Sequence, residues 1–234
     1  MHLTADTSSK AGRFQIKGVK PYQGNRTGKD KPPLLEPLRQ AIANRDNWLE
    51  EYDVTLHRIL EADDGMIHDA YRLKEHGVIW SDDKDLRMTP YPYFDKEKGI
   101  VLPSEEFGWL TPKITPSGKV KLIGQGPLFF WAQMLMGDTA DNVKGILKYN
   151  GKLCAEDGAY KALEKCKDIH EAANTVLDGY RSIDQNPLPE GWMLWLLRWP
   201  GDNFWDYCMS LNLSEENGKY LHECRGRDWF QDSA

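Results

Sequence analysis

The sequence predicts an α/β front half followed by a helical back half, with the changeover near residue 125. Three observations support this division. Before residue 87, short apolar runs of strand length alternate with apolar residues at helical spacing. Residues 87–124 are rich in Pro, Gly, Tyr and Lys without a helical period, which predicts loops and short hairpin strands. From Pro127 onward the apolar spacing is mainly helical.

The front half contains two predicted helices and two predicted strands. Leucines at helical spacing predict a helix over residues 33–44. A second helix, over residues 62–76, has an apolar face and is stopped by Gly77. Short strands are expected at residues 52–56 and 78–80, and the second of these is a continuous apolar run.

The back half is predicted to be almost entirely helical. The apolar spacing places helices at residues 127–136, 155–167, 168–183, 188–198 and about 203–211. With 234 residues, 40% of them hydrophobic, the chain can bury a core without disulfide bonds. Its four cysteines form no CxxC pair, which indicates reduced, mostly buried thiols of a cytoplasmic protein. No apolar run approaches the roughly 20 residues of a membrane-spanning helix, so no membrane partner is expected.

The charge distribution is uneven along the chain. A formal net charge of −6 argues against a simple polybasic nucleic-acid binder. Residues 1–32, however, carry seven basic side chains and two acidic ones. Residues from about 8 to 32 are therefore interpreted as an exposed, mobile basic arm. Two interpretations stay open for this arm: a solvated loop, or a surface that contacts phosphates.

Carboxylates form three groups, each at the end of a predicted element. The groups are Glu61, Asp63 and Asp64; Asp83 and Asp85; and Asp138 and Asp141, which a helical turn would place on one face. Taken singly, they are consistent with helix capping or polar turns. If they converge, however, they repel one another unless cations neutralise them. Hard divalent ions suit an all-oxygen site, and two such ions are suited to phosphodiester hydrolysis.

These segments resemble the 5′–3′ exonuclease and flap endonuclease family, which includes the nuclease domain of bacterial DNA polymerase I and stand-alone phage exonucleases. The segments Glu61–Asp64, Val78–Asp85 and Gly137–Gly145 occur in the order and approximate spacing of the family motifs. Residues 22–26, Tyr-Gln-Gly-Asn-Arg, resemble the family's Tyr-Lys-x-Asn-Arg segment. The match runs from about residue 2 to about residue 170, and the helical tail is more similar to a phage enzyme.

The resemblance implies a fold and a function. Residues 1–125 are expected to form a PIN-like α/β nuclease core, a mainly parallel sheet with helices on both faces. Residues 126–234 are expected to form a helical lobe, with a DNA-binding helix-three-turn-helix at about 137–167. The implied activity is metal-dependent 5′–3′ exonuclease or flap endonuclease cleavage of DNA, with replication proteins as further expected partners.

The resemblance also implies roles for single residues. Glu61, Asp63, Asp64 and Asp83 are expected to hold a first Mg²⁺ or Mn²⁺, and Asp85, Asp138 and Asp141 a second. Asp6 matches the acidic residue that ends the family's second core strand, and Arg26 matches the basic residue that contacts the reacting phosphate. Without these eight carboxylates the formal charge of −6 becomes +2, so the acidic total no longer argues against DNA.

DNA contacts are implied at two places. The first is the segment holding Tyr22 and Asn25. The second is the turn of the helix-three-turn-helix, where a potassium ion is also expected, and its residues are Lys144, Gly145, Lys148, Gly151 and Lys152. Backbone amides at a helix start are a natural phosphate site, which agrees with this expectation.

Two departures from the family pattern leave alternatives open. Gln23 stands where the family has a lysine, so either Lys20 or Lys17 reaches the same phosphate or that cation is missing. The family's first core strand, which ends in an Asp, has no counterpart. Either Met1 is internal to a longer reading frame, or a separate chain supplies the strand, or activity is reduced. The alternative functions are therefore a catalytically weak or inactive structure-specific DNA-binding protein and one part of a split nuclease.

Overall fold

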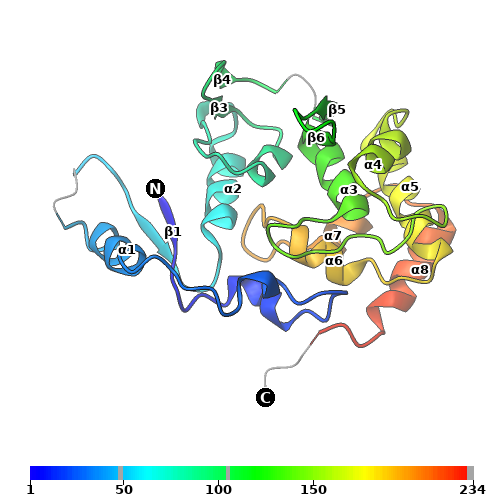
Figure 1. Cartoon of the computed structure of the whole chain (residues 1–234), viewed down its shortest axis with the longest axis horizontal. Coiled ribbons are helices and arrows are strands. Elements are labelled where there is room, and N and C mark those ends of the chain that lie inside the picture. The colour runs from blue at the N-terminus through cyan, green and yellow to red at the C-terminus, as the bar shows by residue number, and fades with distance from the viewer. Residues whose placement is uncertain (47–49, 104–105, 231–234) are drawn as a thin grey trace.

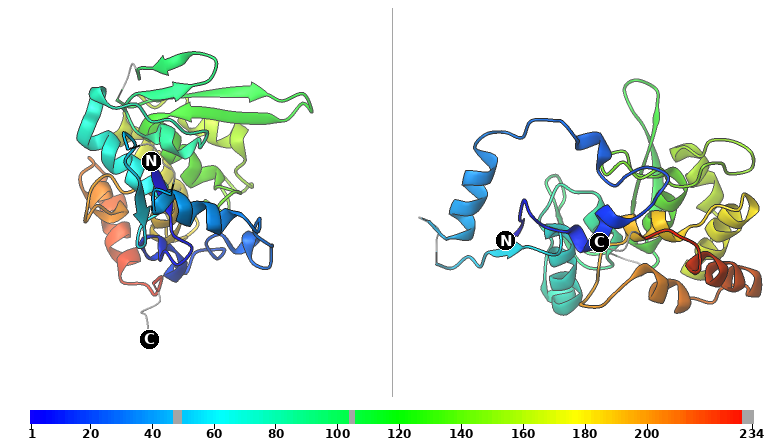
Figure 2. Two further views of the ribbon diagram at one scale, coloured as in Figure 1. Left: turned by 90° about the vertical axis from the view of Figure 1, so that its left-hand side faces the viewer. Right: turned by 90° about the horizontal axis from the view of Figure 1, so that it is seen from below.

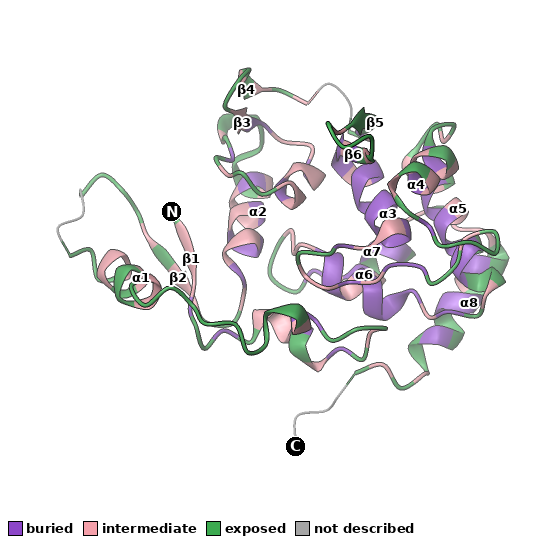
Figure 3. Ribbon diagram, viewed as in Figure 1, coloured by how far each residue is buried: buried purple, intermediate pink, exposed green. Residues whose placement is uncertain are grey.

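The computed structural model describes residues 1–46, 50–103 and 106–230. The structure is 42% helical and 14% strand, so the predicted mixture of helix and strand is confirmed at this coarse level. In Figure 1 the N-terminal elements lie to the left and the helical back half lies to the right. Burial is concentrated in the helical half, as Figure 3 shows.

The N-terminal part contains one parallel strand pair and two helices. Its elements, in chain order, are β1 (His2–Thr4), α1 (Leu35–Ala43), β2 (Thr55–His57) and α2 (Ala62–Leu73). Strands β1 and β2 pair in parallel, and α1 lies in the connection between them. The helices predicted over residues 33–44 and 62–76 are confirmed, and the strand predicted at 52–56 is present in part as β2.

The middle of the chain forms hairpins, as its composition predicts. The first hairpin pairs β3 (Tyr93–Asp95) with β4 (Gly99–Val101), and the second pairs β5 (Trp109–Ile114) with β6 (Val120–Gln125). A short 3-10 turn, η4 (Asp85–Met88), precedes them. The turn η4, which begins at Asp85, contacts both α2 and the first helix of the back half.

The expected mainly parallel sheet is not formed by the residues that the structure describes. These residues form three separate two-stranded sheets, of which one is parallel and two are antiparallel. The apolar run at residues 78–80 contributes only a parallel bridge from Ile79 to Tyr93. A continuous apolar run is typical of a strand buried on both faces. Here Ile79 is buried but Trp80 is 75% exposed, so the run is covered on one face only.

Six helices form the back half of the described chain. They are α3 (Gly126–Met136), α4 (Glu156–Leu163), α5 (Ile169–Ser182), α6 (Leu188–Leu194), α7 (Phe204–Met209) and α8 (Glu215–Arg225). Helix α3 is apolar on nearly all sides, which predicts a buried helix, and it contacts α4, α5 and α6. The five helices predicted here are confirmed, although α6 ends four residues earlier than expected.

Helix α8 was not expected from the sequence. Its composition is polar and includes Gly218, a poor helix former, so no clear apolar stripe is visible. Its buried face is Asn217, Tyr220, Leu221 and Cys224, which are spaced three and four apart as a helix requires. Asn217 is completely buried and bonds to α5, donating to Asp178 Oδ1 at 3.0 Å. Because the polar Asn217 lies on the buried face, the apolar spacing of α8 is interrupted in the sequence.

The basic arm is packed against the rest of the protein rather than exposed throughout. It contains two short 3-10 turns, η1 (Lys10–Gln15) and η2 (Gly24–Arg26). Arg13, Ile16 and Tyr22 are buried, and the amide of Lys17 donates to Trp229 O at 2.9 Å. Figures 1 and 2 show this dark-blue segment joining the β1–β2 side of the molecule to the helical half. The expectation of an exposed arm is therefore met at residues 25–34 and is wrong for Arg13, Ile16 and Tyr22, which are buried.

Two findings concern the membrane and the cysteines. No helix in the described ranges is long and apolar enough to cross a membrane. All four cysteines are free, and Cys154, Cys208 and Cys224 are buried. Burial raises the pKa of Cys154 to about 11, which keeps it in the thiol form at neutral pH.

Candidate functional site

An open cleft, called the acidic cleft below, lies between the N-terminal segment, the start of α2 and the loops that follow Trp80 and α3. It contains about 1660 Å³ of space, part of it open to solvent. Its acidic lining comes from segments that are distant in sequence, and much of its basic lining comes from the arm and α1. The acidic residues are Asp6, Asp30, Glu61, Asp63, Asp83, Asp85 and Asp141; the basic residues are Lys10, Arg26, Lys29, Lys31, Arg39 and Lys84.

The first acidic group sits at the start of α2, where two of its members cap the helix. Glu61 accepts a backbone N–H of the first turn, and Asp64 accepts the N–H of Glu61 at 3.1 Å. Arg13 donates to both carboxylate oxygens of Asp64 at 2.9 and 2.8 Å and to Trp195 O at 2.6 Å. Asp64 is completely buried and does not line the cleft. It is therefore removed from the expected metal ligands, since Arg13 already neutralises it.

Asp63 differs from its neighbours because its carboxylate faces the cleft without a partner. It accepts no hydrogen bond or ion pair from the described residues, whereas Lys10 lies 3.1 Å from Glu61 and Arg13 holds Asp64. Burial and the nearby charges of Asp83 and Glu61 raise the pKa of Asp63 to about 7. Since Asp63 has no counterion among the described residues and other carboxylates lie nearby, a cation bound beside it would relieve this repulsion.

The second acidic group lies in the loop after the apolar run at residues 78–80. Asp83 is exposed in the cleft and accepts the backbone N–H of Asp85 at 2.9 Å. Asp85 lies between Lys84 Nζ at 2.7 Å and Gln133 Nε2 at 2.6 Å. Burial raises the pKa of Asp85 to about 6, although Lys84 acts in the opposite direction.

The third acidic group is held by a closed loop after α3. Asp138 and Val143 exchange backbone hydrogen bonds at 2.9 and 2.7 Å. Gly137 and Gly145 have φ of 76° and 68°. A Cβ on either glycine would lie 2.5 Å from backbone atoms on the opposite side of the loop. This close approach explains why glycines flank the motif.

The loop separates its two carboxylates instead of placing them on one helical face. Asp138 Oδ2 contacts Lys84 Nζ at 2.6 Å, while Asp141 accepts from Gln23 Nε2 at 2.7 Å and from Arg26 at 2.8 Å. Lys84 lowers the pKa of Asp138 despite its burial, and burial raises the pKa of Asp141. The helical-turn expectation was wrong: Asp141 lines the acidic cleft, whereas Asp138 is buried beside Lys84 and is not one of the lining residues.

The segment at residues 22–26 positions carboxylates. Tyr22 is 5% exposed, and its hydroxyl donates to Glu61 at 2.7 Å. Asn25 Nδ2 donates to Thr139 O at 2.8 Å, which fixes the segment to the third acidic loop. The expectation that Tyr22 contacts DNA is therefore corrected, since its ring is buried; Asn25 is exposed but already bonded within the protein.

The lysine that accompanies Gln23 in the cleft is Lys10. Its Nζ bonds to Gln23 Oε1 and lies 3.1 Å from Glu61. Lys20 does not line the cleft, and Lys17 is paired with Asp228 at 2.5 Å. Neither of the two lysines expected to substitute at this position is present there, and Lys10 supplies the cation instead.

The remaining basic residues that line the cleft come mainly from the arm and α1 and are called the basic wall below. Lys29 and Lys31 come from the arm, Arg39 comes from α1, and Arg26 is half exposed beside Asp141. Asp6 lines the same cleft but is exposed and paired with Lys31. The expectation that the arm contacts phosphates stays a prediction; these cations line the cleft, and Arg26, Lys29 and Lys31 are exposed.

The donor set of the acidic cleft fits hard divalent ions, since it consists of carboxylates and a buried amide without a nearby thiol or paired histidine. No group of three or more His, Cys, Asp or Glu side chains is already arranged to hold a metal ion in the described part of the chain. Lys10, Arg13, Arg26 and Lys84 instead neutralise most of the carboxylates. A metal ion at Asp63 would not have to displace any of these cations.

The turn predicted to bind duplex DNA and potassium divides into two parts. The amides of Lys144 and Gly145 donate to the buried carboxylate of Glu190 at 3.1 and 3.0 Å. Gly145 O accepts Gln185 Nε2 at 3.0 Å. The backbone groups expected to meet a phosphate or a potassium ion thus have protein partners, and the residues at Gly145 do not fit a potassium site.

The second part of this turn is exposed. Tyr149 and Lys152 exchange backbone hydrogen bonds around Asn150 and Gly151, whose φ values of 50° and 76° suit an Asn-Gly turn. Lys148, Gly151 and Lys152 are all exposed, so they remain available for the predicted contact with DNA.

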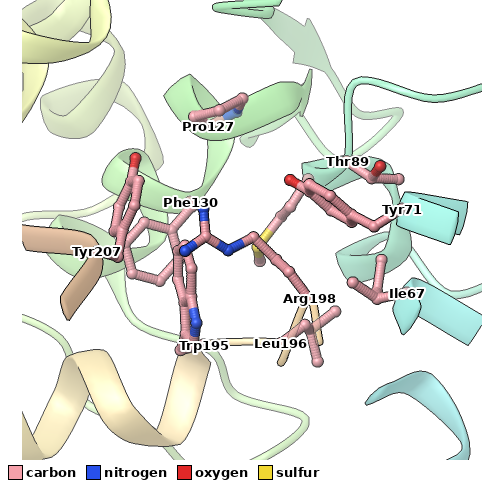
Figure 4. A pocket seen from close by; sticks show the side chains of 10 residues that line it. Ile67, Tyr71, Thr89, Pro127, Phe130, Trp195, Leu196, Arg198 and Tyr207 are labelled. Carbon is pink, nitrogen blue, oxygen red and sulfur yellow. The ribbon is translucent and has the colours of Figure 1, made fainter. Parts of the chain in front are cut away.

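A second, smaller pocket contains no reactive group. It lies between α2 and the helical half, with about 440 Å³ of space, and Figure 4 shows its mixed aromatic and aliphatic lining. Its one charged lining side chain, Arg198, is held by Asp202 at 2.9 and 2.8 Å and lies 4.9 Å from the ring of Trp195. This pocket is part of the packing between the two halves, and none of the predicted site residues lines it.

Comparisons with protein-family models, curated proteins and solved structures found no match. The functional assignment therefore depends on the residues of the cleft. Sequence reasoning missed Arg13, Lys10, Lys84 and Gln133. Two of these carried a visible signal: Lys84 stands between two predicted ligands, and Gln133 is a polar residue in the otherwise apolar α3.

Proposed function

We propose that the protein is a metal-dependent nuclease that cleaves DNA phosphodiesters as a 5′–3′ exonuclease or flap endonuclease. The observation that carries this proposal is the convergence of Asp63, Asp83 and Asp141 on one cleft with a basic wall. Such a cleft suits a phosphodiester, because the acids attract divalent ions and the wall attracts the phosphates. The resemblance to the PIN-like nuclease family supports the same reading.

The proposed ligands fall into two sets. Glu61, Asp63 and Asp83 would hold the first Mg²⁺ or Mn²⁺, and Asp85, Asp138 and Asp141 would hold the second, directly or through water. When bound, such ions lower the pKa of a water molecule and stabilise negative charge on the leaving oxygen. Tyr22 and Gln23 keep Glu61 and Asp141 oriented through the hydrogen bonds that they donate.

Basic residues would orient the substrate. Arg26, 2.8 Å from Asp141, and Lys10, 3.1 Å from Glu61, would contact the scissile phosphate, while Lys29, Lys31 and Arg39 would hold neighbouring phosphates. Lys148 and Lys152 on the exposed turn would contact the duplex part of the DNA. Contacts of this kind position the strand but do not read its sequence.

Cleavage of a 5′-flap duplex in Mg²⁺ or Mn²⁺ tests the proposal. Asp83→Ala and Asp138→Ala are expected to lower the cleavage rate by about 100-fold or more, since each removes a ligand or its support. Asp82→Asn is the matched control, because Asp82 is exposed and paired with Lys96 outside the cleft. If cleavage survives both alanine substitutions, the assignment of these carboxylates as the metal site is wrong.

The alternative is a structure-specific DNA-binding protein with weak or no catalysis, alone or as one part of a split nuclease. The internal pairing of the carboxylates with Lys10, Arg26 and Lys84 favours it, because neutralised acids have less need of metal. Flap binding without cleavage at any Mg²⁺ or Mn²⁺ concentration supports this alternative. Cleavage that appears only after a second chain is added supports the split form.

A further inference from the structure

Lys84 places a positive charge between two carboxylates that belong to different loops. Its Nζ lies 2.7 Å from Asp85 Oδ1 and 2.6 Å from Asp138 Oδ2. Asp138 is almost completely buried, whereas the Lys84 side chain is 43% exposed. An ammonium in this position does electrostatically what a bound cation would do, because it neutralises both acids at once. Its exposed stem leaves it a path out of the site.

A buried amide marks the same position independently. Gln133 is completely buried in α3, and its Nε2 donates to Asp85 Oδ1 at 2.6 Å. Its Oε1 is also buried and has no hydrogen-bond partner among the described residues. Leaving such a buried acceptor unpaired is unfavourable. Two carboxylates and an unused amide oxygen are the ligand chemistry that Mg²⁺ and Mn²⁺ prefer.

We propose that Lys84 is an internal cation, an inference that rests on the proposed function. Its ammonium occupies the site of the second divalent ion and leaves when that ion binds. The two ion sites then differ in character. In the first, the only carboxylate that Lys10 contacts is Glu61, and neither Asp63 nor Asp83 forms an ion pair among the described residues. The second is filled only in exchange for Lys84, so its affinity for metal is lower. The displaced ammonium remains at the cleft, where a substrate phosphate would be its new partner.

Binding of Mn²⁺ alone, without DNA, tests this inference. Isothermal titration of the wild type is expected to show one tighter and one weaker site. In Lys84→Met the weaker site tightens by about tenfold, which corresponds to about 1.4 kcal/mol, because no cation competes for Asp85 and Asp138. Lys96→Met, which removes an exposed lysine paired with Asp82, leaves both affinities unchanged. Lys84→Gln repeats the test with a polar side chain and guards against misfolding of the methionine variant.

The outcomes separate this inference from the proposed function. If folded Lys84→Met and Lys84→Gln both retain the tighter site but bind the second ion no more strongly than the wild type, the role of Lys84 is wrong and the nuclease proposal stands. Absence of Mn²⁺ binding in the wild type and in both variants would contradict both. Tightening of the second site in both variants, without change at the first, supports the exchange.

Discussion

Arg13→Met is expected to lower the free energy of unfolding by about 3–5 kcal/mol, because it leaves a buried carboxylate without its counterion. Arg13 is 1% exposed and joins three parts of the chain that are far apart in sequence. It contacts both oxygens of Asp64, one oxygen of Glu61 and the carbonyl oxygen of Trp195. Urea unfolding followed by circular dichroism measures the loss.

Two further variants test whether the unpaired charge of Asp64 causes this loss of stability. Lys17→Met removes an exposed lysine of the same segment, paired with Asp228, and is expected to change stability by less than about 0.5 kcal/mol. The double variant Arg13→Met with Asp64→Asn is expected to recover part of the loss, since the unpaired charge is gone. A loss below about 1 kcal/mol in Arg13→Met would show that the buried ion pair does not join the two halves.

Asp63→Asn is expected to stabilise the metal-free protein at pH 8 by about 2 kcal/mol, although it removes a proposed metal ligand. The pKa of Asp63 is raised to about 7 in the folded protein, by burial first and by Asp83 and Glu61 next. Between its ordinary pKa near 4 and pH 7, the folded state therefore holds a proton that the unfolded state releases. The stability of the wild type falls as the pH rises through this window, and asparagine removes that dependence.

Unfolding in urea with EDTA at pH 4.5 and pH 8 measures this effect. The advantage of Asp63→Asn over the wild type should be large at pH 8 and small at pH 4.5. Asp82→Asn, in which the exposed neighbouring acid is changed, should show no such difference. Added Mn²⁺ should reverse the order at pH 8, because it stabilises the wild type by binding the folded state. If Asp63→Asn is more stable than the wild type by the same amount at both pH values, the pKa of Asp63 is not raised in the folded protein.

The part of the site that could be predicted from sequence is the part encoded by short motifs. Asp63, Asp83 and Asp141 each lie beside a helix end or turn, and those local signals led directly to the cleft. The partner of each acid is decided by tertiary structure, which local patterns do not contain. Arg13 and Asp64 are 51 residues apart, and nothing near either residue indicates that they pair.

The same limit explains the errors in the arm and the sheet. Tyr22 and Arg13 lie in a segment rich in Gly and Lys, which is typical of solvated chain, yet both are buried by partners from elsewhere. Helices such as α2 and α5 were predictable because their apolar faces repeat within a few residues. The arrangement of the strands was not predictable in this way, since pairing depends on contacts between distant segments.

The central claim is that the acidic cleft holds divalent ions at named carboxylates, and diffraction from crystals soaked in Mn²⁺ tests it most directly. The anomalous signal of manganese is expected at two positions in the cleft. One should be bounded by Glu61, Asp63 and Asp83, and the other by Asp85 and Asp138, with the Lys84 ammonium moved away. Manganese bound only outside the cleft, or absent from it while Lys84 keeps its contacts with Asp85 and Asp138, would contradict the claim.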